Sequence, residues 1–322
     1  MTELKEYTAY IDKNLKDISF PSKPSALYDP IRYFLNIGGK RIRPILTLLG
    51  TELFGGNKEE AISQALSIEV FHNFTLVHDD IMDEAPLRRN QATIHHKWNT
   101  NVGILSGDVM MIKAYQLLCQ INSKQLPEAL NVFSTTAIEV CEGQQMDMDF
   151  ESRNDVTVAE YIEMIRLKTS VLLGAALTIG AIVANASEKD KKNIYAFGQN
   201  IGIAFQIQDD ILDLYADPLK FGKQVGGDVI ANKKTILYLT ALTDATKEQR
   251  EILKQLDKEK DIELKITRTR QLFDQLKVKE SCKERMQAYY SLAKENLDKI
   301  NVPDENKRKL LELASFLMDR EI

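Results

Sequence analysis

The same pattern of three carboxylates occurs twice, in two distant parts of the chain. It is DDxxD, formed by Asp79, Asp80 and Asp83 and again by Asp209, Asp210 and Asp213. On a helix, the first and third aspartates of each triad share one face, because they are four residues apart. Like charges on one face repel each other, and Mg²⁺, which takes carboxylate, water and phosphate oxygens, relieves that repulsion. The triads therefore indicate a site for Mg²⁺ and a substrate that carries phosphate.

Each triad follows an apolar run that is compatible with a helix. The runs are SIEVFHNFTLV before the first triad and IGIAFQIQ before the second. A solvated helix face explains one acidic cluster well. Two carboxylate clusters at the ends of buried helices are costly unless they are paired or bound to metal. The repetition therefore favours two clusters that face one cavity and hold several Mg²⁺ ions and a diphosphate.

Basic residues in two places suit a phosphate group. Arg88 and Arg89 follow the first triad and offer guanidinium forks. Lys40, Arg41 and Arg43 follow the two glycines of GGKRIRP, at 38–44, where glycine allows the backbone to approach a ligand closely. The proline of this motif suits the first turn of a helix, whose N–H groups also bind anions. The alternative is a basic helix start without a ligand.

The composition predicts a helical protein with a large core. Among 322 residues, 15 are Gly and 8 are Pro, so residues that break helices are rare. The formal net charge of −5 does not indicate a nucleic-acid surface. Cys119, Cys141 and Cys282 have the spacing of neither a disulfide framework nor a zinc site, and they fit a reducing cytosol. We therefore expect a cytoplasmic protein that does not bind nucleic acid.

No segment is predicted to cross a membrane. The N-terminal stretch is charged and lacks the apolar core of a signal peptide. The longest apolar run, VLLGAALTIGAIVA at 171–184, has 14 residues, which is short of the roughly 20 that span a bilayer. This run is expected to be a buried core helix whose glycines allow close packing against other helices.

Short polar breaks predict antiparallel helices that follow one another closely. A helix is expected at 4–18, a loop at 21–30, and a helix that carries Tyr33, Phe34 and Ile37 into GGKRIRP. The later helices are expected at about 44–54, 58–83, 100–121, 127–149, 157–184, 190–215, 233–242, 247–256, 262–296 and 304–319. No long linker separates the two triads, so we expect one all-α domain over residues 1–322.

Seven motifs occur in the order and spacing of one enzyme family. They are the two DDxxD triads, GGKRIRP (38–44), RRNQATIH (88–95), GQQMD (143–147), KTS (168–170) and GKQVGGDVIANKKT (222–235). Together they resemble the short-chain trans-polyprenyl diphosphate synthases. The resemblance implies an antiparallel helical bundle around a deep central cavity, and a homodimer. It also implies Mg²⁺-dependent head-to-tail condensation of isopentenyl diphosphate with dimethylallyl, geranyl or farnesyl diphosphate.

The resemblance assigns ligand-binding roles residue by residue. Three Mg²⁺ ions are expected at each site, with Asp79, Asp83 and Asp209 as metal ligands. The groups expected to hold the diphosphate of isopentenyl diphosphate are Lys40, Arg43, His72 and Arg89. Those expected to hold the allylic diphosphate are Arg88, Lys168, Lys223 and Lys233, although a single lysine is more often a solvated surface charge.

Other matched residues are expected beside the metal ions and the reacting carbons. Gln144 and Asp147 form a GQxxD motif beside the metal cluster. Thr169 and Gln206 offer oxygen dipoles but no nucleophile, which suits a carbocation intermediate. His78, directly before the first triad, is expected to support the site or belong to the core rather than bind a ligand.

The helix that carries Asp79 is expected to limit product length. Thr75 lies about one turn before Asp79 on the same face, and Phe74 is rotated roughly 100° from it. An aromatic residue at this position limits elongation in the family, so Phe74 and Thr75 are expected to form the floor for the growing chain. Phe71 is the next candidate. The pattern resembles the synthases of twenty-carbon products, with fifteen carbons as the alternative; ordinary core packing would also explain Phe74.

Four turn residues depart from the family pattern. They are Asn90, Ala92 and Asn232, where the family has Gly, Pro and Gly, and Ala216, where it has Gly. Two other functions remain open. A class I terpene cyclase also uses DDxxD but would have a different second motif and no GGKRIRP. A non-catalytic subunit of a hetero-oligomeric prenyl synthase would be expected to have lost aspartates, and both triads are intact.

Overall fold

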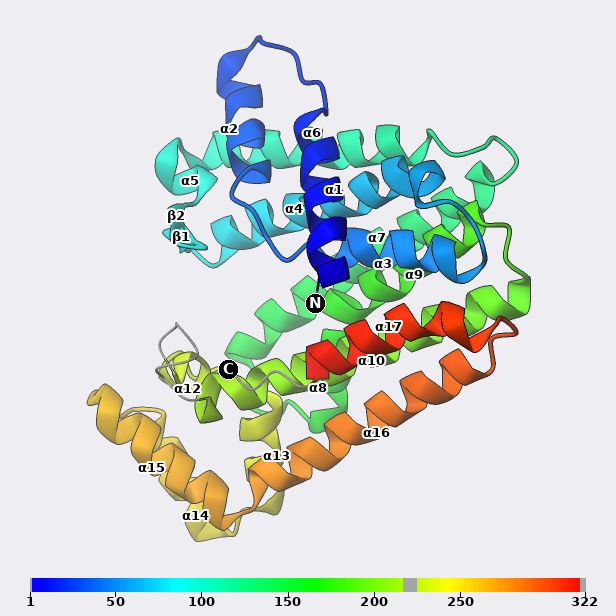
Figure 1. Ribbon diagram of the computed structural model, residues 1–322. Coiled ribbons are helices and arrows are strands. Elements are labelled where there is room, and N and C mark those ends of the chain that lie inside the picture. The colour runs from blue at the N-terminus through cyan, green and yellow to red at the C-terminus, as the bar shows by residue number, and fades with distance from the viewer. Residues whose placement is uncertain (1, 217–224, 319–322) are drawn as a thin grey trace. The chain divides into compact units, whose positions relative to one another are not determined.

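The computed structural model describes residues 2–216 and 225–318, which are mostly helical (Figure 1). They form two compact units. The first comprises Met1–Ser134, Ala175–Lys191 and Val302–Asn306. The second comprises Thr135–Gly174, Lys192–Asn301 and Lys307–Ile322. The first triad therefore belongs to the first unit and the second triad to the second unit.

Most elements of the first unit precede residue 119. They are α1 (Thr2–Lys16), α2 (Ser25–Leu35), α3 (Ile42–Leu53), the 3₁₀ helix η1 (Lys58–Ala61), α4 (Ile62–Met82), β1 (Leu87–Arg88), β2 (Gln91–Ala92), α5 (Ile94–Lys97) and α6 (Thr100–Leu118). Helix α4, which carries the first triad, packs along α6 and against α3. Ser67 on α4 donates a hydrogen bond to the Ala114 carbonyl on α6, with 2.7 Å between the oxygens. This packing fixes the helix whose last turn carries Asp79.

The second unit contains the elements around the second triad. They are α8 (Val158–Ile165), the π-helix η2 (Arg166–Ser170), α12 (Gly227–Ile230), α13 (Ile236–Asp244), α14 (Lys247–Leu256), α15 (Ile262–Gln275) and α16 (Val278–Asp298). Helices with residues in both units are α7 (Leu126–Ser152), α9 (Val171–Val183), α10 (Glu188–Tyr215) and α17 (Asp304–Met318).

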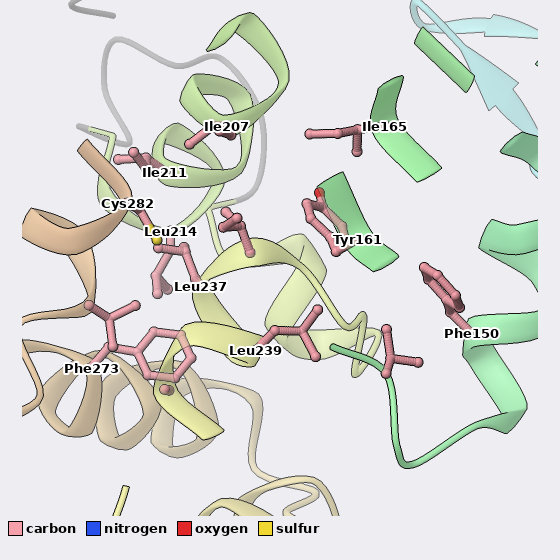
Figure 2. Close-up of a cluster of buried hydrophobic side chains, with 14 of the residues drawn as sticks. Phe150, Tyr161, Ile165, Ile207, Ile211, Leu214, Leu237, Leu239, Phe273 and Cys282 are labelled. Carbon is pink, nitrogen blue, oxygen red and sulfur yellow. The ribbon is translucent and has the colours of Figure 1, made fainter. Parts of the chain in front are cut away.

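A buried hydrophobic cluster holds the helices of the second unit together (Figure 2). Ile207 and Ile211 on α10 belong to it, as do Tyr161 on α8, Leu237 on α13 and Phe273 on α15. Apolar residues at i and i+4 form the buried stripe of a helix, so Ile207 and Ile211 place one face of α10 in this core. The second triad, at 209–213, therefore lies on a helix that the core holds in place.

One helical run passes a length and composition test for a membrane span. It is Val158–Val183, and 83% of its most apolar window is buried inside the structure. It is a core helix, as the sequence predicted for residues 171–184. A Cβ added at Gly180 would lie 2.1 Å from the Thr47 carbonyl oxygen, so α9 needs glycine where it meets α3.

Two of the predicted helix boundaries are wrong. The expected helix at 262–296 is two helices, because Lys277 has the left-handed backbone conformation with φ of 54° and so ends α15 before α16 begins. The expected loop at 21–30 is shorter, because α2 already begins at Ser25 and includes Pro30. Neither feature has a glycine that would reveal it in the sequence.

Candidate active site

The first triad lies at the end of α4, and its three carboxylates have different surroundings. The Asp83 N–H donates to the Asp79 carbonyl at 2.8 Å, so the helical turn continues and both side chains share one face. Asp83 is exposed and Asp79 is half-buried, whereas Asp80 is 1% exposed. The outer two aspartates are therefore the ones that can reach a ligand.

Asp80 instead fixes the arginines that follow it. Its Oδ1 accepts a hydrogen bond from Arg88 Nε at 2.8 Å. Burial raises the pKa of Asp80, and the Arg88 guanidinium opposes that effect. Its Oδ2 is buried without a hydrogen-bond partner. This partly buried ion pair connects the end of α4 to strand β1.

Arg88 and Arg89 lie on a two-strand hairpin that the sequence did not predict. Strands β1 and β2 pair antiparallel, with Arg88 opposite Gln91. The two turn residues, Arg89 and Asn90, have φ of 50° and 61°. A tight hairpin favours positive φ at both central residues, and asparagine adopts it more readily than most residues. Asn90 therefore preserves the left-handed turn where the family pattern has glycine.

A cluster of basic side chains surrounds His72 on α4. Arg43 Nη1 lies 3.1 Å from His72 Nε2, and because arginine only donates, the imidazole nitrogen accepts. A Cβ added at Gly39 would lie 2.4 Å from Arg89 Nη1, so the Arg89 guanidinium lies directly against the GGKRIRP backbone. The cluster therefore brings together the predicted residues Arg43, His72 and Arg89. Lys40, from the same motif as Arg43, is exposed.

The cluster has more positive than negative charge. Burial, and then the nearby guanidinium groups of Arg43, Arg89, Arg88 and Arg41, lower the pKa of His72 well below its usual range, so His72 is neutral. Burial also lowers the pKa of Arg43 to about 10, and Arg89 contributes to the decrease. Arg43 Nε is buried without a hydrogen-bond partner. A group of this kind is suited to an anion with several oxygens, such as a diphosphate.

Arg41 has a structural role that no sequence signal distinguished from that of Arg43. It is 4% exposed and donates to Glu69 Oε1 at 2.5 Å, Asp12 Oδ1 at 2.9 Å and the Leu35 carbonyl at 3.0 Å. Its charge is thus matched by two carboxylates from α1 and α4. The arginines of GGKRIRP therefore differ: Arg41 holds the motif in place, and Arg43 faces the cluster.

The predicted floor residues lie in an aromatic group beneath the first triad. The Phe74 ring contacts the His78 ring, with centroids 4.8 Å apart, and the Phe71 ring, with centroids 5.6 Å apart. Phe71 also meets Phe133 at 5.1 Å. Thr75 is half-buried, and its hydroxyl donates to the His72 carbonyl at 2.8 Å. His78 packs against Gly107 on α6, which fits the expectation of a supporting residue.

In the second triad the middle aspartate is again the buried one. Asp210 is 5% exposed and accepts hydrogen bonds from the Tyr161 hydroxyl at 2.5 Å and the Ile236 N–H at 3.4 Å. Burial raises the pKa of Asp210 to about 8. Asp209 and Asp213 are half-buried. Tyr161 was not predicted as a site residue, because a tyrosine 49 residues away from Asp210 has no motif to mark it.

Backbone N–H groups of Gly226 and Asp228 contact Asp213. The Asp228 N–H donates to Asp213 Oδ2 at 3.0 Å, and the Gly226 N–H donates to the Asp213 carbonyl at 2.6 Å. Burial, followed by the Asp213 carboxylate, raises the pKa of Asp228 to about 6. Asn232 has φ of 54°, so it too keeps a left-handed turn where the family has glycine. Lys233, which follows, is exposed. Lys223 lies outside the described residues.

A π-turn places the KTS motif beside GQQMD. Residues 166–170 form the π-helix η2, and such single π-turns are frequent at functional sites. Lys168 Nζ lies 2.5 Å from Asp147 Oδ2, which brings two predicted substrate-binding residues together. A Cβ added at Gly143 would lie 2.2 Å from the Lys168 N, so this contact also requires glycine. Gln144 is 8% exposed, while Thr169 and Gln206 are half-buried.

The donor set of both triads fits Mg²⁺ that keeps water and substrate oxygens as ligands. In the described part of the chain, no three His, Cys, Asp or Glu side chains are grouped so that they could hold a metal alone. Mg²⁺ in phosphate-transferring sites commonly has one or two protein carboxylates and completes its shell with water and phosphate. The outer aspartates of each triad offer ligands of this kind.

Comparison with known proteins decides the family. A sequence model of the polyprenyl synthetase family matches residues 24–274. The chain belongs to the polyprenyl synthetase family. It is a prenyltransferase, and the predicted family, enzyme class and all-α fold are confirmed.

The similarity to individual members extends over the whole chain. The geranylgeranyl pyrophosphate synthase of Geoglobus acetivorans is 36% identical over 320 residues, which cover 99% of this chain and 98% of the relative. A crystal structure of a geranylgeranyl pyrophosphate synthase has 43% identity and a TM-score of 0.94, covering 99% of both chains. A polyprenyl synthase from Caulobacter crescentus CB15, 25% identical with a TM-score of 0.85, was solved with calcium and isoprenyl diphosphate; the match covers 100% of this chain and 96% of that one. Members of the family use a divalent metal.

Proposed function

We propose that this polyprenyl synthetase condenses isopentenyl diphosphate with an allylic diphosphate and releases chiefly a twenty-carbon, geranylgeranyl product. The observation that carries this proposal is the cationic cluster of Arg43, Arg89 and neutral His72 beside the first triad. A cyclase has one diphosphate to hold, whereas a condensing enzyme must hold two. The second set of cations, Lys168 and Lys233, is available for the second diphosphate.

Separate groups of residues bind the two diphosphates and the metal. The Arg43 and Arg89 cluster, with Lys40, holds isopentenyl diphosphate, and Arg88, Lys168 and Lys233 hold the allylic diphosphate. The outer aspartates Asp79, Asp83 and Asp209 hold the metal. Bound Mg²⁺ supplies Lewis-acid neutralisation of the charge on the departing diphosphate.

The reacting carbons need surroundings that stabilise positive charge without capturing it. Thr169 and Gln206 present oxygen dipoles to an allylic cation, and neither is a strong nucleophile. An apolar pocket that excludes water protects this cation from hydrolysis. The double bond of isopentenyl diphosphate then forms the new carbon–carbon bond, and a proton is lost. The released diphosphate is the base that we propose for that proton.

We further propose that residues 1–322 act as a single cytoplasmic catalytic domain in a homodimer. The family match at 24–274 includes residues of both compact units, which supports one catalytic domain. Helix α6 has an exposed apolar face, with Leu105 57% and Ile112 59% exposed, seven residues apart. Residues seven apart lie on one helix face, and an apolar face of this kind suits a second copy of the chain.

The decisive experiment is a product assay with each allylic primer. The protein is incubated with Mg²⁺, isopentenyl diphosphate and dimethylallyl, geranyl or farnesyl diphosphate, and product chain length is measured. The expected result is a main product of twenty carbons from every accepted primer. Conversion of geranylgeranyl or farnesyl diphosphate to a hydrocarbon without isopentenyl diphosphate would instead identify a cyclase. A main product of fifteen carbons would overturn the proposed chain length but not the reaction.

A further inference from the structure

A buried lysine on α15 contacts the turn that presents Lys233. Lys265 is 5% exposed, and its Nζ donates to Asn232 Oδ1 at 2.6 Å and to the Ile230 carbonyl at 3.2 Å. Both acceptors are neutral, and among the described residues no carboxylate forms an ion pair with Lys265. Burying an ammonium group costs free energy unless it is well compensated. Packing alone therefore does not explain a lysine at this buried position.

The short helix α12 is held at both of its ends. At its start, the Asp228 N–H and Gly226 N–H donate to Asp213 of the second triad. At its end, the ammonium group of Lys265 meets the carbonyl of Ile230, the last residue of α12. The C-terminal carbonyls of a helix favour a cation. The four-residue helix α12 thus contacts Asp213 near its start and Lys265 at its end.

The turn after α12 is also held by further hydrogen bonds. Asn232 Nδ2 donates to the Asp257 carbonyl at 3.1 Å, and the Tyr238 hydroxyl donates to Asp257 Oδ2 at 2.8 Å. The Lys233 N–H donates to the Asp228 carbonyl at 2.9 Å. The Asn232 side chain therefore lies between Lys265 and Asp257, and its backbone leads directly into Lys233.

We infer that Lys265 is a positioning residue for the allylic diphosphate. It fixes the Asn232 turn and the end of α12, and thereby the places of Lys233 and Asp213. This inference rests on the proposed role of Lys233 and extends it to α15, a helix that lies outside every motif of the sequence. Because Asn232 replaces a glycine of the family pattern, its amide gives Lys265 an acceptor that glycine lacks.

The test compares Lys265→Met with wild type in the full-length protein, with both substrates and saturating Mg²⁺. Methionine keeps most of the side-chain volume and removes the ammonium group. We expect the KM for the allylic diphosphate to rise about tenfold, which is within the range of coupling between residues in direct contact, such as Lys265 and Asn232. The KM for isopentenyl diphosphate should stay within about twofold. Lys307→Met is the matched control, since Lys307 is 6% exposed, lies on α17 of the same unit and donates to the Asp298 carbonyl. It should leave the ratio of the two KM values unchanged.

A double-mutant cycle separates positioning from loss of stability. Asn232→Gly restores the glycine of the family, keeps the left-handed turn and removes the acceptor of Lys265, so we expect an allylic KM about threefold above wild type. In this background, Lys265→Met should add less than its full effect, because both changes remove the same contact. Equal rises in both KM values, or independent effects of the two substitutions, would overturn the inference. If Lys265→Met does not fold, Asn232→Gly alone decides, and an unchanged allylic KM overturns it. A wild-type enzyme without condensing activity would refute the proposed function instead.

Discussion

At the scale of single residues, the two triads use their aspartates in the same unequal way. Asp80 and Asp210 are buried and hydrogen-bonded to Arg88 and Tyr161, respectively. The first and third aspartates of each triad are half-buried or exposed. Adjacent residues on a helix point about 100° apart, so a pair of consecutive aspartates places one carboxylate toward the core and one toward a ligand. We therefore propose the outer aspartates of the triads as the metal ligands.

This difference predicts unequal effects of substitution. Asp79→Asn should lower kcat by at least about 100-fold, because it removes charge that stabilises the transition state. Asp80→Asn should lower it by less than about tenfold, because the asparagine oxygen can still accept from Arg88 Nε. Steady-state kinetics over a Mg²⁺ titration measures both. Similar losses in the two variants would contradict the assignment, as would full wild-type turnover in excess chelator.

His72 predicts a specific dependence of stability on pH. Its pKa in the folded protein lies well below the usual 6.5, so below pH 6.5 the unfolded chain takes up a proton that the folded chain does not. Stability contributed by this residue is therefore lost as the pH falls. His72→Gln should unfold with a weaker pH dependence, and the difference from wild type should change by about 2 kcal/mol between pH 7 and pH 5.

The measurement is urea unfolding of the substrate-free protein at each pH. His96→Gln is a suitable control, since His96 is exposed to solvent and lies outside the cationic cluster. Parallel pH profiles for wild type and His72→Gln would show that His72 is not held neutral.

At the scale of elements, we propose that α4 connects the chemistry to the length of the product. Phe74 lies on this helix beneath Asp79 and packs on Phe71 and His78. Replacing Phe74 by Ala should open space below the metal site, so that the growing chain extends further and products longer than twenty carbons accumulate. Chromatography of the products after phosphatase treatment measures this shift.

Loss of stability has to be separated from this effect. Phe→Ala in a core typically costs about 3–5 kcal/mol, so Phe74→Leu, which creates a smaller space, should give a smaller shift in a more stable protein. An unchanged product distribution in active Phe74→Ala would move the floor to Phe71.

The sequence predicted the elements that carry chemistry better than the elements that connect them. The apolar runs before both triads are helices, as predicted, because their burial pattern is strong. The break at Lys277, the start of α2 at Ser25 and the hairpin at 87–92 were missed. Lys277 and Arg89 have left-handed backbone angles although neither residue is a glycine, and such angles are hard to predict from the sequence.

The candidate site was predictable to a similar extent. Arg43 and Arg89, which belong to short motifs, lie close in space to His72. The contacts of Tyr161, Arg41 and Lys265 were not predicted, because their partners are 49, 28 and 33 residues away and no local pattern records a long-range hydrogen bond. The π-turn at Lys168 was also not visible, since its composition is that of an ordinary helix.

At the scale of the whole molecule, the exposed face of α6 predicts association. Light scattering should give a mass about twice the 36.6 kDa of one chain. Ile112→Glu places a charge on this face and should shift the protein toward monomers, because a buried charge at an interface is costly. Ile252→Glu on α14 is the control, since Ile252 is 44% exposed and lies on another unit. A wild-type monomer with full activity at low concentration would refute the dimer.

The cationic cluster around His72 also has a consequence for how the reaction proceeds over time. Its arginines recognise phosphate oxygens and not the hydrocarbon attached to them, so they also suit the inorganic diphosphate that each turnover releases. Accumulating by-product will then compete with fresh substrate, and the forward flux will slow before substrate is exhausted. An inorganic pyrophosphatase added to the assay should relieve this slowing. In a cell, the rate at which the chain lengthens will depend partly on how fast another enzyme hydrolyses the by-product.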